Sequence, residues 1–340
     1  MSSSSPTAPA SDALPAVRPD RLPLLLIPVL ALVALPLVKS FSTWVTLTFA
    51  GLAMGMIIFI IASGLTLVFG LMDVLNFGHG VFITLGAFLA TSVLGAMTRW
   101  TGSESLFDNL VAVFPAMLVA MALTGAVGLA FERVIIRPVY GQPLKQIMIT
   151  MGGAIVGEEL IKVVWGPQAI PLPLPVAFRG SIFFGEAAVE RYRLIAVVAG
   201  LVVFAAMFWV LARTKIGLLI RAGVQDGEMV ESLGYRIRRL FVGVFVTGAA
   251  LTGLGGVLWG LYQQGVIPQM GSLVNVLLFI VIIIGGMGSV GGCFIGALLV
   301  GLVSNYAGFI APKVALFSNI LLMVIVLLWR PEGLYPVGKR

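Results

Sequence analysis

A polar segment interrupts a long apolar stretch, and three of its side chains could do chemistry. Asp73, Asn76 and His79 follow one another at intervals of three residues, which places them on one face if the segment is helical. Polar groups at membrane depth are costly unless they have partners or face water. In one interpretation, Asn76 and His79 satisfy backbone groups freed where the helix breaks at Gly78 and Gly80. In the other, the break lies beside a translocation pathway, and a helix N-terminus after Gly80 offers N–H groups to an anion.

A second group of charges lies inside another apolar run. Glu158 and Lys162 are four residues apart with the acidic residue first, which is the order that favours an ion pair on one helix, and Glu159 is adjacent. We therefore expect an intramembrane ion pair. A proton or ion relay is the alternative that these residue types leave open.

The longest polar connection, residues 212–239, contains six basic and three acidic residues. Two short helical pieces are expected in it. Asp226 can cap the second piece, because its carboxylate accepts N–H groups of the first turn, and Glu228 adds negative charge near the positive helix end. Gly234 suits the left-handed residue that ends a helix. Taken alone, these residues also fit a basic inner loop that serves only membrane orientation.

No group of residues suits covalent or metal chemistry. The chain has one histidine, His79, and one cysteine, Cys293. A single cysteine excludes an internal disulfide and a metal site built from several cysteines. The two residues are far apart in the sequence and form neither a catalytic triad nor a zinc site. The G-x-G-x-x-G run at 286–291 lacks the acidic residue about 20 positions later that a dinucleotide site needs, and no P-loop motif occurs. We expect no catalytic residue, no metal and no cofactor in this chain, so that partner subunits must bind any ATP.

The elements that position these groups are predicted to be membrane helices. Of 340 residues, 59% are hydrophobic and 10% are charged, where a soluble globular protein carries about 25% charged residues. This composition excludes a soluble domain, a disordered chain and a protein that coats nucleic acid. The 41 glycines suit helices that pack closely in lipid.

Ten apolar segments have lengths near the ~20 residues that a membrane-spanning helix needs. They are 22–38, 45–69, 81–97, 110–131, 147–164, 194–211, 240–262, 274–286, 293–310 and 314–329. We expect an all-α, polytopic transmembrane helical bundle with eight to ten spans. A short sequence echo between residues 80–87 and 292–297 leaves open two related halves, with half-helices near 64–80 and 274–292.

The basic residues predict the orientation of the chain. If the N-terminus is cytoplasmic and all ten segments cross, the inner stretches hold 14 Lys and Arg residues and the outer stretches hold 6, which places both termini inside. Residues 1–21 are rich in Ser, Pro and Ala and are expected to be a disordered cytoplasmic tail. Residues 22–335 are expected to form one transmembrane domain, with the cytoplasmic connection 212–239 and a proline-rich periplasmic loop at 166–193.

Several motifs resemble those of one transporter family. The segment from Gly64 to Gly80, G-L-T-L-V-F-G-x-x-x-x-x-N-F-x-H-G, looks like the hallmark of branched-chain amino acid ABC permeases of the LivH type. Further similar runs are T-M-G-G at 150–153, S-L-G-Y at 232–235, V-T-G-A-A-L-T-G-L-G-G-V-L at 246–258, G-G-M-G-S-V-G-G at 285–292 and R-P-E-G-L at 330–334. The resemblance covers about 45–335. It departs from the family's pattern near Glu159, where an amide is usual and where Glu158 and Glu159 are both acidic.

The resemblance also bears on residues 212–239. The run E-M-V-E-S-L-G at 228–234 is similar to the E-A-A-x-x-x-G coupling motif of importer permeases, with Met and Val in place of the two alanines. In that family the short helix docks into a groove of the ATPase subunit. The resemblance therefore implies an ATPase-coupling loop formed by Arg221, Asp226, Glu228, Glu231 and Gly234.

The resemblance implies an importer in the bacterial inner membrane that carries branched-chain or similar hydrophobic amino acids. Its implied partners are a second permease subunit of the LivM type, two ABC ATPase subunits, a periplasmic substrate-binding protein, the amino-acid substrate and membrane lipid, with no nucleic acid. Permeases of this kind for urea, amides or other amino acids remain an alternative. An ion-coupled secondary transporter that uses Asp73 and the charged group, and a membrane enzyme that uses Asp73 and His79, are alternatives from other classes.

Overall fold

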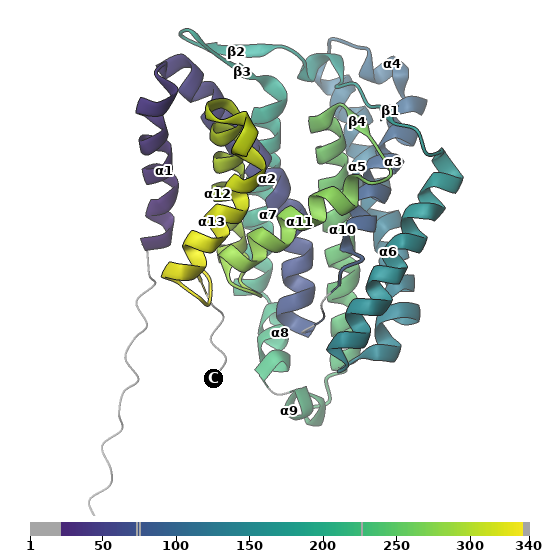
Figure 1. Ribbon diagram of the computed structural model, residues 1–340. Helices are drawn as coiled ribbons and strands as arrows, with labels where there is room; N and C mark the ends of the chain where they lie inside the picture. Colours follow the sequence, from purple (N-terminus) through teal and green to yellow (C-terminus); the bar gives the residue numbers. More distant parts are fainter. Residues whose placement is uncertain (1–21, 73, 75, 226, 336–340) are drawn as a thin grey trace, which may run out of the picture.

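The computed structural model describes residues 22–72, 74, 76–225 and 227–335. The predicted tail 1–21, Asp73 and Asp226 lie outside the described residues. Figure 1 shows a bundle of helices with almost no sheet, and thirteen α-helices are found in the described ranges. The all-α class that the sequence predicts is confirmed.

Each of the ten predicted apolar segments is a helix. These helices are α1 (Leu22–Val38), α2 (Phe41–Met72), α3 (His79–Ala96), α5 (Leu106–Phe131), α6 (Pro143–Trp165), α7 (Arg191–Arg213), α10 (Ile237–Gln263), α11 (Met270–Gly285), α12 (Val290–Ile310) and α13 (Ala315–Trp329). Six described helices, α2, α3, α5, α7, α10 and α12, are long and apolar enough to cross a membrane. Helices α1, α11 and α13 are apolar but shorter. A polytopic membrane bundle is therefore confirmed, and the number of full spans stays a prediction.

Helix α2 differs from the prediction of a half-helix near 64–80, because it continues without a break to Met72. Its glycines serve packing: a Cβ atom at Gly64 would collide with the carbonyl oxygen of Gly248, and one at Gly70 would collide with the backbone of Gly288. Close approach of backbones through glycine is typical of membrane helices. The break is confined to the short segment between α2 and α3.

The core lies where α2, α3, α5, α10 and α12 pack together. The stretch Ile57–Ile61 of α2 is completely buried. Glycines on α10 bring it close to two helices. A Cβ at Gly253 would overlap Thr124 of α5, and one at Gly256 would overlap the backbone of Ile83 of α3. The buried middle of α2 thus lies at the centre of the bundle, and α2 packs against α12, α10, α7 and α11.

The remaining elements lie at the two ends of the bundle (Figure 1). One end carries α4 (Thr98–Thr101), η3 (Val176–Phe178), η4 (Pro312–Val314), the hairpin of β2 (Ser181–Phe184) and β3 (Ala187–Glu190), and β1 (Ile170–Pro171) paired antiparallel with β4 (Gly265–Val266). The other end carries η1 (Glu132–Ile136), η2 (Arg137–Val139), α8 (Lys215–Gln225) and α9 (Gly227–Ser232). The connections 166–193 and 212–239 therefore lie at opposite ends of the bundle.

Candidate functional site

Two helix N-termini meet inside the bundle. Helix α3 begins at His79 and α11 begins at Met270, and they approach each other at Gly80 and Gly271. A Cβ at Gly80 would lie 2.7 Å from the carbonyl oxygen of Gly271. The backbone N–H of Gly271 donates a hydrogen bond to Thr84 Oγ1 at 2.9 Å. Glycine is needed on both helices because any side chain would separate them.

A small pocket of about 20 Å³ opens beside this contact, between α3, α6 and α11, and has room for about one water molecule. It is lined by Phe77, Gly80, Val81, Thr84, Ala154, Glu158, Ile161, Pro268, Ser272 and Asn275. The structure thus brings together parts of two groups that lie far apart in the sequence. Phe77 comes from the polar segment before α3, and Glu158 comes from the charged group on α6.

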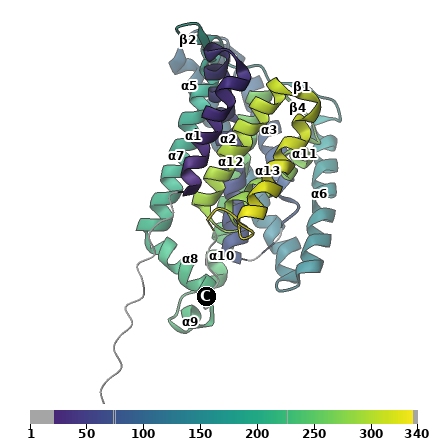
Figure 2. The same ribbon diagram turned by 60° about the vertical axis from the view of Figure 1, so that its left-hand side comes forward.

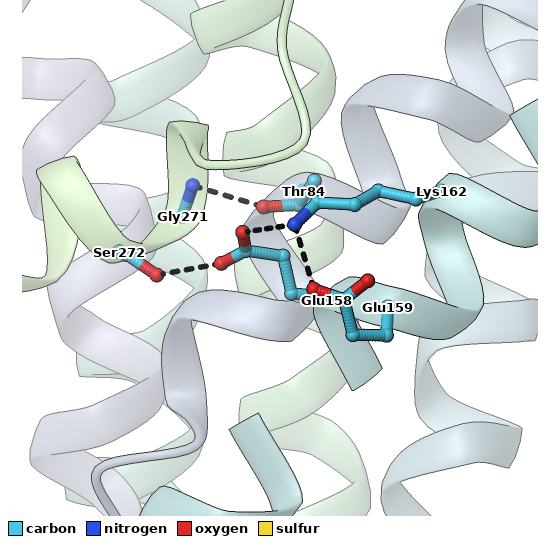
Figure 3. Close-up of polar contacts among 6 residues, drawn as sticks. All are labelled: Thr84, Glu158, Glu159, Lys162, Gly271 and Ser272. Atoms are coloured by element: carbon cyan, nitrogen blue, oxygen red, sulfur yellow. Dashed lines mark hydrogen bonds and ion pairs between the residues drawn. The ribbon is translucent and has the colours of Figure 1, made fainter. Parts of the chain in front are cut away.

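Figure 3 shows the charged group reaching from α6 toward α11. The expected ion pair is present, with Lys162 Nζ 3.1 Å from Glu158 Oε1. The same ammonium group lies 2.7 Å from Glu159 Oε1, so it bridges both carboxylates. Ser272 Oγ donates to Glu158 Oε2 at 3.2 Å. Glu158 is therefore held from two sides, whereas the side chain of Glu159 is 62% exposed.

The polar segment itself is tied to the surrounding protein. Asn76 is fully buried, and its Oδ1 accepts a hydrogen bond from the N–H of Gly78 at 3.0 Å, which closes the turn before α3. His79 is buried as well, with Nε2 2.6 Å from Thr252 Oγ1 on α10. Neither side chain lines the pocket. The contact of Asn76 suits the interpretation in which it satisfies a backbone group at the helix break, whereas His79 joins α3 to α10. Asp73 lies outside the described residues.

Sequence reasoning missed the polar residues of α10 and α11. Asn275 Nδ2 donates to the carbonyl oxygen of Phe77 at 3.1 Å, and its Oδ1 is buried with no partner among the described residues. Ser272 and Asn275 are three residues apart at the start of a short apolar segment, and that spacing was the available signal. Thr252 gave no such signal, because a threonine in an apolar helix commonly bonds only its own backbone.

The predicted coupling residues that the structure describes lie in α8, in α9 and just after α9. Arg221 Nη1 donates to the carbonyl oxygen of Leu211 at 2.9 Å, which fastens α8 to the end of α7. Gly234 has φ +86°, the left-handed conformation that the sequence predicts, and its N–H donates to the carbonyl oxygen of Glu231 at 2.9 Å. Glu228 lies within α9, and Asp226 lies outside the described residues. The exposed surface of this unit contains the apolar side chains of Met229, Leu233 and Tyr235.

Nothing in the described ranges resembles a metal centre, since no group of three or more His, Cys, Asp or Glu side chains could hold an ion there. Cys293 is buried and free. The pocket between α3, α6 and α11 combines helix N-termini with carboxylate, hydroxyl and amide groups.

Comparisons with known proteins agree with this picture of a membrane bundle. Residues 47–329 match a family described as branched-chain amino acid transport system / permease component. The chain is 32% identical to the high-affinity branched-chain amino acid transport system permease protein BraD of Pseudomonas aeruginosa, over 84% of this chain and 93% of that protein. It is 24% identical to LivH of Escherichia coli, over 87% and 96%, and 26% identical to LivM of Escherichia coli, over 84% and 69%. No solved structure matches the chain significantly.

Proposed function

Since this chain belongs to the family of branched-chain amino acid transport permease components, we propose that it is the permease subunit of an ATP-driven importer for branched-chain or similar hydrophobic amino acids. The family match over 47–329 carries this proposal, because it spans almost the whole bundle. The family is one of transport permeases rather than of enzymes. The distribution of basic residues supports an orientation with both termini in the cytoplasm, and membership of the permease family supports a position in the bacterial inner membrane.

The proposed importer contains a second permease, two ABC ATPase subunits and a periplasmic binding protein. Two similar relatives from Escherichia coli, named LivH and LivM, are both called permease proteins of a high-affinity branched-chain amino acid transport system. Two distinct permease chains in one system support a heterodimeric permease here. The sequence contains no P-loop motif, which supports ATP binding by partner subunits.

The unit formed by α8 and α9 is the proposed ATPase-docking element. Figure 2 shows it extending beyond the ends of the spanning helices. An exposed apolar surface on a short helix suits insertion into a groove of a partner. Helix α8 contacts α2, and α2 leads directly into the segment before α3. A displacement of α8 and α9 on ATP binding would therefore reach the contact between α3 and α11 through α2.

The pocket is the proposed site that substrate passes on its way through the membrane. The N-termini of α3 and α11 carry partial positive charge, and Glu158 supplies negative charge within the same pocket. These opposite charges suit the carboxylate and ammonium groups of an amino acid. The volume of about 20 Å³ has room for about one water molecule, so passage of an amino acid would require the surrounding helices to move apart.

Two variants of matched chemistry test the docking element. Leu233 next to α9 is 65% exposed, and Leu106 at the opposite end of the bundle is 55% exposed. Replacing either by Asp buries no new charge, so both variants should reach the membrane in normal amounts. We expect Leu233→Asp to reduce co-purification of the ATPase and amino-acid uptake at least tenfold, and Leu106→Asp to change neither more than twofold. Equal behaviour of the two variants would refute the docking role.

A further inference from the structure

Helix α6 has one face against the protein and one face that no other described element covers. Its buried side chains, Gln146, Thr150 and Ile161, face α3 and the η1–η2 segment. The opposite face is apolar and exposed, with Leu144, Met148, Met151, Ile155, Val156, Leu160, Val163 and Val164. Lipid alone could cover such a face. The charged group makes this α6 face different from the other exposed helix faces.

Glu158 and Glu159 lie about two turns before the end of α6, and Lys162 lies about one turn before it. Helix α6 has 23 residues, which corresponds to about 35 Å at the usual rise per residue. Glu159 precedes the end of the helix at Trp165 by six residues, or about 9 Å along the axis. It therefore lies within the ~30 Å hydrocarbon core if α6 crosses the membrane. A carboxylate on a lipid-exposed surface at this depth is costly, and such groups normally face protein or water.

A second feature of the same face points to protein rather than water. Gly152 lies seven residues before Glu159, about two turns away on the same side of the helix. Apart from its own stretch of helix, no described atom lies within 4 Å of the position that its Cβ would occupy, so packing among the described residues does not require a glycine there. Small outward residues in membrane helices let another helix approach closely. The flanking leucine, isoleucine and valine side chains would likewise pack against a helix better than they would line an aqueous channel.

The charges also discriminate between partners. Two carboxylates and one ammonium group give the Glu158–Glu159–Lys162 group a formal charge of −1. A second copy of this chain, related by a two-fold axis beside the outer face of α6, would place an identical negative group opposite this one. Like charges facing each other in an apolar interface oppose association. A different chain with a basic or hydrogen-bond-donating side chain opposite Glu159 would neutralise the group.

We propose that the outer face of α6, from Gly152 to Val163, is the surface that binds a second, non-identical permease chain, and that this chain places a basic or donor group against Glu159. The proposal rests on the proposed function and adds the surface and the kind of partner. Because Glu158 extends from α6 into the pocket, the partner would adjoin that pocket. The pathway then lies beside the interface between the two permeases.

Site-specific photocrosslinking in native membranes tests this surface. p-Benzoylphenylalanine replaces Val156 on α6 (59% exposed) in one sample and Val202 on α7 (62% exposed) in the control. Irradiation followed by mass spectrometry should identify, at Val156 only, an adduct with another chain that matches the same permease family. Ile155 provides a second position on the α6 face if the first replacement prevents assembly. An adduct with a differently tagged copy of this chain, adducts with lipid alone, or equal adducts at both helices would overturn the proposal.

A charge variant separates failure of this surface from failure of the proposed function. We expect Glu159→Lys to lower co-purification of the second permease at least tenfold and Glu159→Gln to lower it less than threefold. If both variants keep the second permease and ATP-driven uptake persists, the α6 surface is wrong and the importer function stands. If the unaltered protein has no second permease and no ATP-driven uptake, the proposed function itself fails.

Discussion

The hydrogen bond between His79 and Thr252 predicts a measurable coupling free energy between these two side chains. Thr252 Oγ1 lies 2.6 Å from His79 Nε2 and 2.8 Å from the carbonyl oxygen of Gly248. If the single hydroxyl proton goes to the carbonyl oxygen, the imidazole must donate its own proton to Thr252. In Thr252→Val the ring nitrogen remains buried and loses this partner.

The size of the effect follows from the burial of both residues. Leaving a buried donor unpaired costs about 1–3 kcal/mol, while double-mutant cycles between membrane helices give an average near 0.6 and a maximum near 1.7 kcal/mol. We therefore expect a coupling free energy of about 1 kcal/mol between Thr252→Val and His79→Phe. The cycle is needed because Thr252→Val alone also changes packing against α2.

The assay is unfolding of the purified chain by SDS in mixed micelles, followed by fluorescence of its six tryptophans. The four proteins of the cycle are compared at the same lipid content. If the unfolding free-energy changes of the two single variants add to that of the double variant within about 0.3 kcal/mol, the hydrogen bond is refuted.

Because His79 does not line the pocket, we also expect His79→Phe to change the KM for leucine uptake less than threefold. A tenfold increase in KM would instead make His79 a substrate contact.

Two further predictions concern the pocket. Gly271→Ala places a methyl group against the carbonyl oxygen of Gly80, so we expect it to destabilise the protein by about 1–3 kcal/mol in thermal unfolding; an unchanged melting temperature would contradict the close contact. Lys162→Met leaves two unneutralised carboxylates, whereas Glu158→Gln leaves the ammonium group paired with Glu159 at 2.7 Å. We expect a clearly lower melting temperature for Lys162→Met than for Glu158→Gln, and the reverse order would show that the lysine does not neutralise this group.

The helices could be predicted from the sequence because each one is a continuous apolar run. All ten predicted segments are helical, since membrane helices must satisfy their backbone groups internally wherever an apolar run is long enough. The continuity of α2 could not be predicted, because a glycine that packs against another helix looks the same in the sequence as one that ends a helix. Gly64 needs Gly248 as its neighbour, and no local pattern connects these two positions.

The site was predictable only where its contacts are local. The ion pair of Glu158 with Lys162 depends on a spacing of four residues within one helix. The hydrogen bond from Ser272 to Glu158 joins positions 114 residues apart, and it exists because α6 and α11 converge in three dimensions. For the same reason, the sequence predicted the polar segment and the charged group as two separate sites. It could not show that residues from both line one pocket.

The measurement that tests the central claim most directly is leucine uptake into proteoliposomes that contain the complete complex with its ATPases and soluble binding protein. We expect uptake that requires ATP on the ATPase side and the binding protein on the opposite side, and that is unaffected by collapse of proton or sodium gradients. Uptake by this chain alone, driven by an ion gradient without ATP, would contradict the assignment as an importer permease and favour an ion-coupled transporter.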